Sequence, residues 1–201
     1  FPTRRSSDLG LPRRPQRGAV ETYHRIREQA RIQLEGQRTG TSRYELLPPA
    51  EGQGLSRLPE PSPGDVFLDI ESDPFVGLSG LEYLFGWTTA SAGEPHSFSR
   101  WALDAASEKA AFEEFIDFVM ARWAQRPGLH VYHFAAYEPG ALKRLMGRYA
   151  TREDELDRLL RAELFVDLHL VVRHSLKASV ESYSIKELEQ FYGLRREQDL
   201  R

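Results

Sequence analysis

The stretch Val66-Phe67-Leu68-Asp69-Ile70-Glu71 says most about the architecture of this chain. An apolar run of this length indicates a strand, and alternate side chains of a strand point to the same face, so Asp69 and Glu71 are expected to share one side of a sheet. Two anions side by side repel each other unless a cation lies between them. The spacing therefore suggests a metal site; the alternative is an acidic strand end that enters the turn at Ser72-Asp73-Pro74.

Outward from this stretch, the residue patterns predict an α/β fold with a βββαβα order. Three short strands come first and suggest an antiparallel meander, over Val66–Ile70, Leu81–Thr89 and Ser97–Leu103. An apolar stripe at helical spacing follows, capped by Asp104 or Ser107 and ended by Pro127-Gly128. The remaining elements are expected to be a strand over Leu129–Phe134, a helix after Pro139, a helix over Thr151–Arg161, a strand at Leu164–Val166, a helix over Leu168–Leu176 and a short helix opened by the capping-box pattern at Ser184.

The N-terminal third is expected to lie outside this domain. Residues 1–9 look like the translation of a sequencing-adapter oligonucleotide, which predicts an assembly artefact and a gene that continues upstream. Residues 10–62 are expected to hold one helix, over Glu21–Gln37, and an extended Pro- and Gly-rich linker with a possible short strand at Tyr44–Leu47. The domain proper is expected over 63–201.

The amino-acid composition limits the class of protein and the kinds of metal site that the chain can form. The chain of 201 residues is 40% hydrophobic, enough to bury the core of one domain. It has no apolar run that could span a bilayer and no signal-peptide core, so a cytoplasmic protein without a membrane partner is expected. The absence of cysteine excludes disulfides, thiolate zinc sites and cysteine nucleophiles, which leaves carboxylates and histidines for metal binding.

The charge is distributed unevenly. Residues 1–43 carry ten Arg and four acids, whereas residues 44–201 carry 17 basic and 26 acidic residues. An acidic domain binds nucleic acid poorly by net charge alone, so divalent ions or neighbouring domains would have to supply the attraction.

A second acid of interest is Glu138. Pro139 disfavours helical geometry in the residue before it and suits the first helical position, which places Glu138 at the cap of a helix at a strand-to-helix corner. Open α/β sheets bind ligands at such edges. The alternative is a carboxylate that only interacts with the helix N-terminus.

The order of these motifs resembles the start of the DEDD-type exonucleases of the ribonuclease H-like fold. Asp69 and Glu71 match the first motif, Asp-x-Glu, and His133-x-x-x-Tyr137-Glu138 matches loosely a second motif that is usually Asn-x-x-x-Phe-Asp. More closely, the run from Asp65 to Leu194 resembles the YprB-like ribonuclease H domain of predicted RecB-family nucleases, which is often joined to a helicase. The segments that carry this likeness are Gly80–Gly86, Val131–Glu138, Phe165–Leu168 and Ser182–Leu188.

The resemblance implies a mixed sheet flanked by helices and a metal-dependent nuclease acting on DNA or RNA, of the 3′-5′ exonuclease type. It implies two Mg²⁺ or Mn²⁺ ions, with Asp69 bridging them and Glu71 and Glu138 completing their shells. His133 would orient phosphate or a ligand, or else be a hydrogen-bonded strand-end histidine, and Tyr137 would be core packing or a base-stacking platform. A helicase and a further nuclease domain are the implied partners in the parent protein.

The family's last Asp has no match before Arg201, so the domain is expected to be incomplete at its C-terminus and the fragment inactive by itself. Tyr183-x-x-x-Glu187 could be taken for that last motif, but helix capping explains Glu187 as well. Asp73, Glu82 and Asp167 are interpreted as structural, and the three Trp residues as core or sheet surface.

Two other functions remain open. A sugar hydrolase also uses paired carboxylates, but it would need a barrel with many more strand-helix units. A non-catalytic module that positions a helicase or another nuclease domain is the stronger rival, because Glu and His replace the usual Asp and Asn of the second motif.

Overall fold

The computed structural model describes residues 19–89 and 94–193, so the expected adapter residues 1–9 lie outside the described part. The chain divides into two compact units. One holds residues 56–171, and the other combines the segment before residue 56 with the segment from residue 172 onward. Within the described residues, no helix is both long and apolar enough to cross a membrane.

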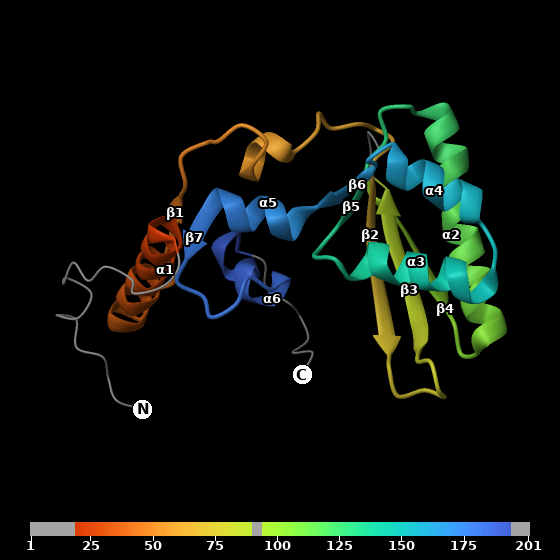
Figure 1. Ribbon diagram of the computed structural model, residues 1–201, viewed down its shortest axis with the longest axis horizontal. Helices are drawn as coiled ribbons and strands as arrows, with labels where there is room; N and C mark the ends of the chain where they lie inside the picture. Colours follow the sequence, from red (N-terminus) through yellow and green to blue (C-terminus); the bar gives the residue numbers. More distant parts are fainter. Residues whose placement is uncertain (1–18, 90–93, 194–201) are drawn as a thin grey trace. The chain divides into compact units, whose positions relative to one another are not determined.

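The unit of residues 56–171 is built on a mixed five-stranded sheet with the order β4-β3-β2-β5-β6 (Figure 1). The strands are β2 (Val66–Asp73), β3 (Leu81–Thr89), β4 (His96–Trp101), β5 (Val131–His133) and β6 (Phe165–Asp167). Strands β2, β3 and β4 form the predicted antiparallel meander, while β5 and β6 run parallel to β2. The α/β class and the βββαβα order are confirmed.

Three helices cover one face of this sheet. They are α2 (Ala105–Gln125), α3 (Tyr137–Tyr149) and α4 (Glu153–Arg161). Asp104 caps α2 through a reciprocal capping box with Ser107, so both predicted capping residues take part. Alternate residues of β2 meet the helices in one apolar core, which also contains Phe85, Phe112, Phe115, Val131, Leu142, Leu145 and Leu156.

Strand β2 is longer than predicted. It continues past Ile70 to Asp73, so Asp69 and Glu71 lie inside a strand and not at its entry into a turn. Ladder hydrogen bonds to β3 hold the extra residues, and a β-bulge interrupts the register between Glu71 and Ser72. Val66, Leu68 and Ile70 face the core, whereas Phe67, Asp69 and Glu71 are exposed on the other side, as the alternation predicts.

The helix α3 also begins earlier than predicted. Its N-cap is Ala136, so Glu138 lies within the first turn and Pro139 at the third helical position. The backbone of Ala135 takes a positive φ of 73°, which turns the chain into the helix before Pro139 can limit its start. Proline is tolerated at this point because the first N–H groups of a helix have no partner within the helix.

The second unit is a small helical and two-stranded assembly. It contains α1 (Val20–Thr39), β1 (Tyr44–Leu46), β7 (Leu176–Ala178), α6 (Ile185–Leu188) and the short 3-10 helix η3 (Glu189–Phe191). Gln29 and Gln33 of α1 donate hydrogen bonds to the carbonyls of Ala178 and Val180. The helix α5 (Leu168–Ser175) carries the chain from one unit into the other.

This grouping differs from the expected division at residue 63, because β1 pairs antiparallel with β7 across a long sequence separation. The sequence did not predict β7, since Leu176 closes a run of helical pattern.

Candidate metal centre

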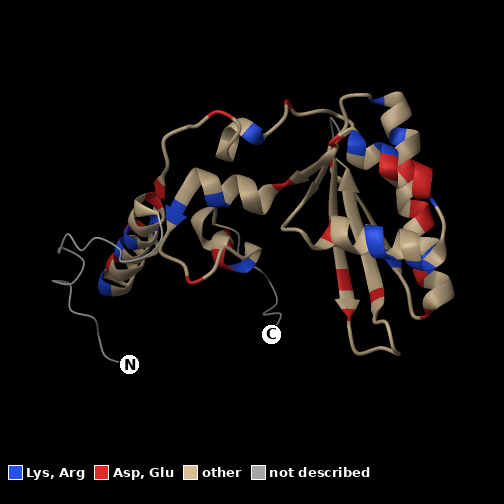
Figure 2. Cartoon of the chain, in the orientation of Figure 1, with Lys and Arg blue, Asp and Glu red and all other residues tan. Residues whose placement is uncertain are grey.

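The candidate acids lie near the carboxyl end of the parallel part of the sheet. Strands β2, β5 and β6 are neighbours and run in the same direction, so the chain leaves β5 for α3 and β6 for α5 at the same edge. Figure 2 shows acidic residues on β2 and at the first turn of α3. In sheets of this kind, ligands bind outside the carboxyl ends of the strands.

Asp69 and Glu138 are electrostatic neighbours. Although part of Asp69 is exposed, the partial burial of its carboxyl raises the pKa, and the negative charge of Glu138 raises it further. Glu138 is 4% exposed, and its Oε2 is buried without a hydrogen-bond partner in the described structure. No Lys or Arg among the described residues forms an ion pair with either acid. A buried carboxylate oxygen in this state is costly unless a ligand matches it.

Glu71 lies two residues beyond Asp69 on the same exposed side of β2. Its side chain forms no hydrogen bond or ion pair with another described residue. Asp69 and Glu138 therefore interact electrostatically, and Glu71 lies two residues from Asp69 on the same strand without a hydrogen bond or ion pair to either.

Gly86 of β3 faces Asp69 directly across the antiparallel ladder. A Cβ atom there would meet the carbonyl oxygen of Asp69 at an ordinary 3.7 Å. A side chain at this position would therefore not clash with the backbone. Because Gly86 has none, the sheet surface beside Asp69 is open.

His133 is held against Glu138 at the end of β5. His133 is 5% exposed, and its Nδ1 lies 2.5 Å from the carbonyl oxygen of Ala135 and 3.5 Å from Oε2 of Glu138. The short contact assigns the Nδ1 proton to a hydrogen bond with Ala135. This is the arrangement expected of a hydrogen-bonded strand-end histidine that also faces the candidate acid.

Tyr137 is anchored rather than free. Its hydroxyl donates to Oε2 of Glu82 at 2.6 Å, and the guanidinium of Arg144 lies over its ring at 5.4 Å from the centroid. Burial and the hydrogen bond to Glu82 raise the pKa of the Tyr137 hydroxyl. Tyr137 as a whole is still 38% exposed, so part of the residue remains accessible to solvent.

Asp167 supports the loop that leads to Glu138. Its Oδ1 accepts hydrogen bonds from the backbone N–H groups of Ala135, His169 and Leu170 at 3.0, 2.9 and 3.2 Å. Two of these bonds cap the start of α5, and the third fixes the strained residue Ala135. Asp167 therefore has the structural role that was predicted, as has Asp73, whose Oδ1 accepts from the N–H of Phe75 at 2.8 Å.

Tyr183 and Glu187 are both engaged within the other unit. The Tyr183 hydroxyl accepts from the N–H of Ala178 at 2.9 Å, and the N–H of Glu187 donates to the Oγ of Ser184 at 3.3 Å. These contacts are those of a strand anchor and a helix cap, which supports the capping interpretation.

The three Trp residues lie where expected. Trp87 is 2% exposed in the core, Trp123 packs against the core, and Trp101 is exposed and stacks on Tyr83 at the sheet surface.

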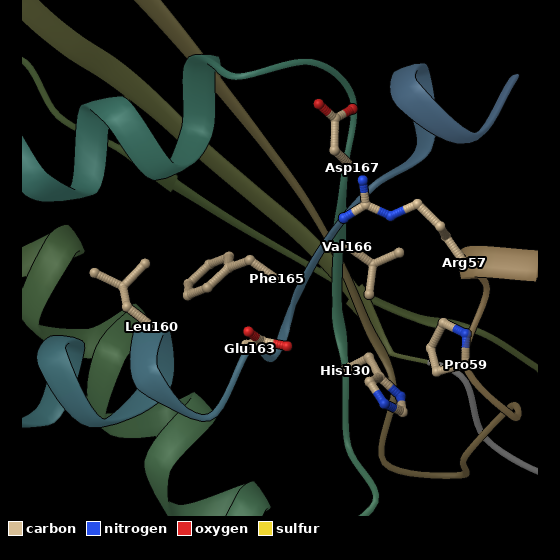
Figure 3. A pocket seen from close by; sticks show the side chains of 8 residues that line it. All are labelled: Arg57, Pro59, His130, Leu160, Glu163, Phe165, Val166 and Asp167. Carbon is tan, nitrogen blue, oxygen red and sulfur yellow. The ribbon is translucent and has the colours of Figure 1, made fainter. Parts of the chain in front are cut away.

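A pocket of about 450 Å³ opens beside β6 and does not include the candidate acids. Figure 3 shows the side chain of Arg57 extending toward Asp167 across this pocket. Its lining combines both charges with apolar groups, from Arg57, Pro59, His130, Leu160, Glu163, Phe165, Val166 and Asp167. We place the candidate centre at Asp69 and Glu138, because these acids interact and the buried Oε2 of Glu138 has no hydrogen-bond partner among the described residues.

The donor set fits a hard cation. Both candidate residues offer carboxylate oxygens, which suit Mg²⁺ or Mn²⁺ better than zinc, and the unpartnered Oε2 of Glu138 is available as a ligand. In the described part of the chain, no three His, Asp or Glu side chains form a complete cluster for an ion. Mg²⁺ is commonly held by only one or two carboxylates, with water and substrate phosphate completing its shell.

A family model described as the RNase_H superfamily matches residues 66–201. Neither the curated proteins nor the solved structures compared contain a match to this chain.

Proposed function

The chain belongs to the RNase_H superfamily, and from this membership we infer that its matched region is a metal-dependent nuclease domain that hydrolyses phosphodiester bonds of nucleic acid. The observation that carries the inference is the pair of Asp69 and Glu138: the charge of Glu138 acts on Asp69, and the buried Oε2 of Glu138 has no partner in the described structure. A divalent cation would satisfy both.

In this proposal Asp69, Glu71 and Glu138 hold two Mg²⁺ or Mn²⁺ ions. When bound, such ions lower the pKa of an attacking water and neutralise the charge that develops on the leaving oxygen. Asp69 presents its carboxylate from the rigid strand β2, opposite the bare backbone of Gly86, where a phosphate can approach. His133 donates its Nδ1 proton to the carbonyl of Ala135, and its ring lies beside Glu138 at the start of α3.

The finer proposal is a 3′-5′ exonuclease that acts on DNA or RNA within a larger protein of the RecB-like nuclease and helicase type. It rests on the order of the Asp-x-Glu and His-x-x-x-Tyr-Glu motifs. The net negative charge of residues 44–201 would repel a nucleic acid. Bound cations or neighbouring domains would therefore have to attract the substrate.

A non-catalytic module is the second candidate. It is favoured by the lack of a third ligand beside Asp69 and Glu138 among the described residues, and by a Glu71 side chain that contacts neither of them. In such a module the acids would be remnants and the fold would serve to position another domain.

A nuclease assay on the full-length gene product distinguishes the two candidates. The substrates are 5′-labelled single-stranded DNA and RNA and a circular single-stranded DNA, each with Mn²⁺ or with EDTA. We expect Mn²⁺-dependent shortening of the linear strands from the 3′ end and no cleavage of the circle. Asp69→Asn and Glu138→Gln should each lower the rate by at least about 100-fold, since loss even of a residue that only supports a metal ligand costs 10- to 100-fold.

The matched control is Asp157→Asn. Asp157 is an exposed acid of α4 that pairs with Arg161, so the substitution makes the same chemical change without touching the candidate centre. It should leave the rate unchanged. Equal residual activity in Asp69→Asn and the wild type would rule out the catalytic role, and absence of any activity in all proteins would favour the non-catalytic module.

A further inference from the structure

Glu82 is a buried acid of β3 that reaches across to α3. It is 4% exposed. Its Oε2 accepts a hydrogen bond from the Tyr137 hydroxyl at 2.6 Å, and its Oε1 accepts one from Nη2 of Arg144 at 2.9 Å. Both donors belong to α3, and Tyr137 directly precedes Glu138. Glu82 thus contacts the helical turn that carries the candidate ligand.

The β-bulge aims Glu82 at this helix. In a regular strand, residues three apart point to opposite faces, yet Glu82 and Phe85 are both buried on the helix side of β3. The register passes from Glu71 opposite Leu84 to Ser72 opposite Glu82, which leaves Tyr83 as the extra residue. The bulge follows Glu71 immediately, and bulges commonly re-aim side chains next to active sites.

A hydrogen bond to a buried acid of α2 holds the backbone of Glu82. Its N–H donates to Oε1 of Glu108 at 2.6 Å, and Glu108 is fully buried in α2. Oε2 of Glu108 in turn accepts from Nη1 of Arg148 at 2.8 Å and from the hydroxyl of Tyr149. Glu82 is therefore a rigid support and not a surface acid that could follow the movements of α3.

The first turn of α3 needs such a support. Its N-cap, Ala136, offers no side-chain hydrogen bond, and the first backbone bond of the helix, from Gly140 to Ala136, is long at 3.4 Å. Ala135 before it is held in a strained conformation by Asp167. The position of Glu138 consequently depends on contacts made from outside the helix.

We propose that Glu82 is a positioning residue for the metal centre: through Tyr137 and Arg144 it fixes the first turn of α3 so that the Glu138 carboxylate stays beside Asp69. It binds no ion itself, because both of its oxygens are occupied by donors. This role rests on the proposed function, and it parallels the supporting residues that orient metal ligands in other proteins.

The test is an Mn²⁺ titration of the 201-residue chain, followed by paramagnetic broadening of backbone amide signals in β2 and α3 below the melting temperature. The midpoint reports ion affinity of the folded protein, which a merely stabilising contact would not change. Glu82→Ala should raise the midpoint by at least about tenfold, the lower limit for removing a residue that supports a metal ligand. Glu82→Gln, which keeps an acceptor oxygen for one donor, should restore part of the affinity.

Tyr137→Phe removes only the hydroxyl and keeps the ring, so it decides the matter if Glu82→Ala does not fold. It should raise the midpoint in the same direction by a smaller factor. Asp117→Ala is the control, because it removes an ion pair between α2 and Arg152 that does not touch the first turn of α3. It should leave the midpoint unchanged.

The outcomes separate this role from the proposed function. If Mn²⁺ broadens the wild-type signals and Asp69→Asn abolishes the effect, but Glu82→Ala and Tyr137→Phe keep the wild-type midpoint, the positioning role is overturned and the metal centre stands. If the wild-type chain shows no broadening in β2 or α3, the metal centre is overturned and the positioning role with it.

Discussion

Two pairs of acids in the same unit differ in what surrounds them. Glu82 and Glu108 are buried, and Arg144, Arg148, Tyr137 and Tyr149 donate to them. Asp69 and Glu138 form the second pair, and neither of them forms an ion pair with a described Lys or Arg. The difference shows that burial alone does not mark a functional acid. The fold accounts for an acid that is matched by donors, but packing and hydrogen bonding do not account for the unmatched pair.

The largest expected effect concerns the matched pair. Glu108→Ala removes a fully buried acid and leaves Arg148 and Tyr149 without their acceptor, so we expect a loss of about 3 to 5 kcal/mol in the free energy of unfolding. Urea denaturation followed by circular dichroism measures it. Asp117→Ala, which breaks a more exposed pair, should cost no more than about 1 kcal/mol. If both variants lost a similar small amount of unfolding free energy, the buried Glu108 would not be stabilised by its donors as we infer.

The effect on the candidate site is a loss of function without a loss of stability. Asp69→Asn should lower nuclease activity by at least about 100-fold, or about 2.7 kcal/mol, while the protein remains folded. An unfolding energy reduced to the level of Glu108→Ala would instead show that Asp69 is a structural acid like Glu108.

The smallest effect is a gain in stability, measured in EDTA. Burial and then the charge of Glu138 raise the pKa of Asp69, so the folded state holds its proton to higher pH than the unfolded state does. The stability contributed by this group therefore falls as pH rises from the ordinary Asp value through the raised one. Asp69→Asn should remove this cost.

Because the Asp69 side chain is partly exposed, the gain should stay below about 1 kcal/mol, which corresponds to a rise in Tm of less than about 4 °C. Thermal melts in EDTA at pH 7 and at pH 3.5 measure it, and the difference between wild type and variant should disappear at the lower pH. A variant that melts below the wild type at pH 7 would mean that the Asp69 carboxylate is stabilised, not repelled, in the folded protein.

Local sequence patterns correctly predicted the strand that carries Asp69 and Glu71 and the cap of α2. The alternation of apolar and acidic residues in Val66–Glu71 placed Asp69 and Glu71 on one side of a strand, and the residues around Asp104 predicted the cap of α2. These features depend on neighbours within a few positions, where strand and helix periodicity act.

Features that depend on distant partners were missed. Glu82 had no partner at a recognisable spacing, because Tyr137 and Arg144 lie 55 and 62 positions away. The bulge after Glu71, the early start of α3 and the strand β7 likewise arise from pairing and packing between segments far apart. The one available signal for Glu82 was an acid within the strongly apolar strand Leu81–Thr89, where an unpaired charge would be costly.

The position of bound Mn²⁺ tests the central claim most directly. Paramagnetic broadening of amide signals in the 201-residue chain should be strongest around Asp69 in β2 and Glu138 in α3, and Asp69→Asn or Glu138→Gln should abolish it. Broadening centred elsewhere, such as at Glu163 and Asp167 beside the pocket, or a pattern that neither substitution changes, would contradict a metal centre at these two acids.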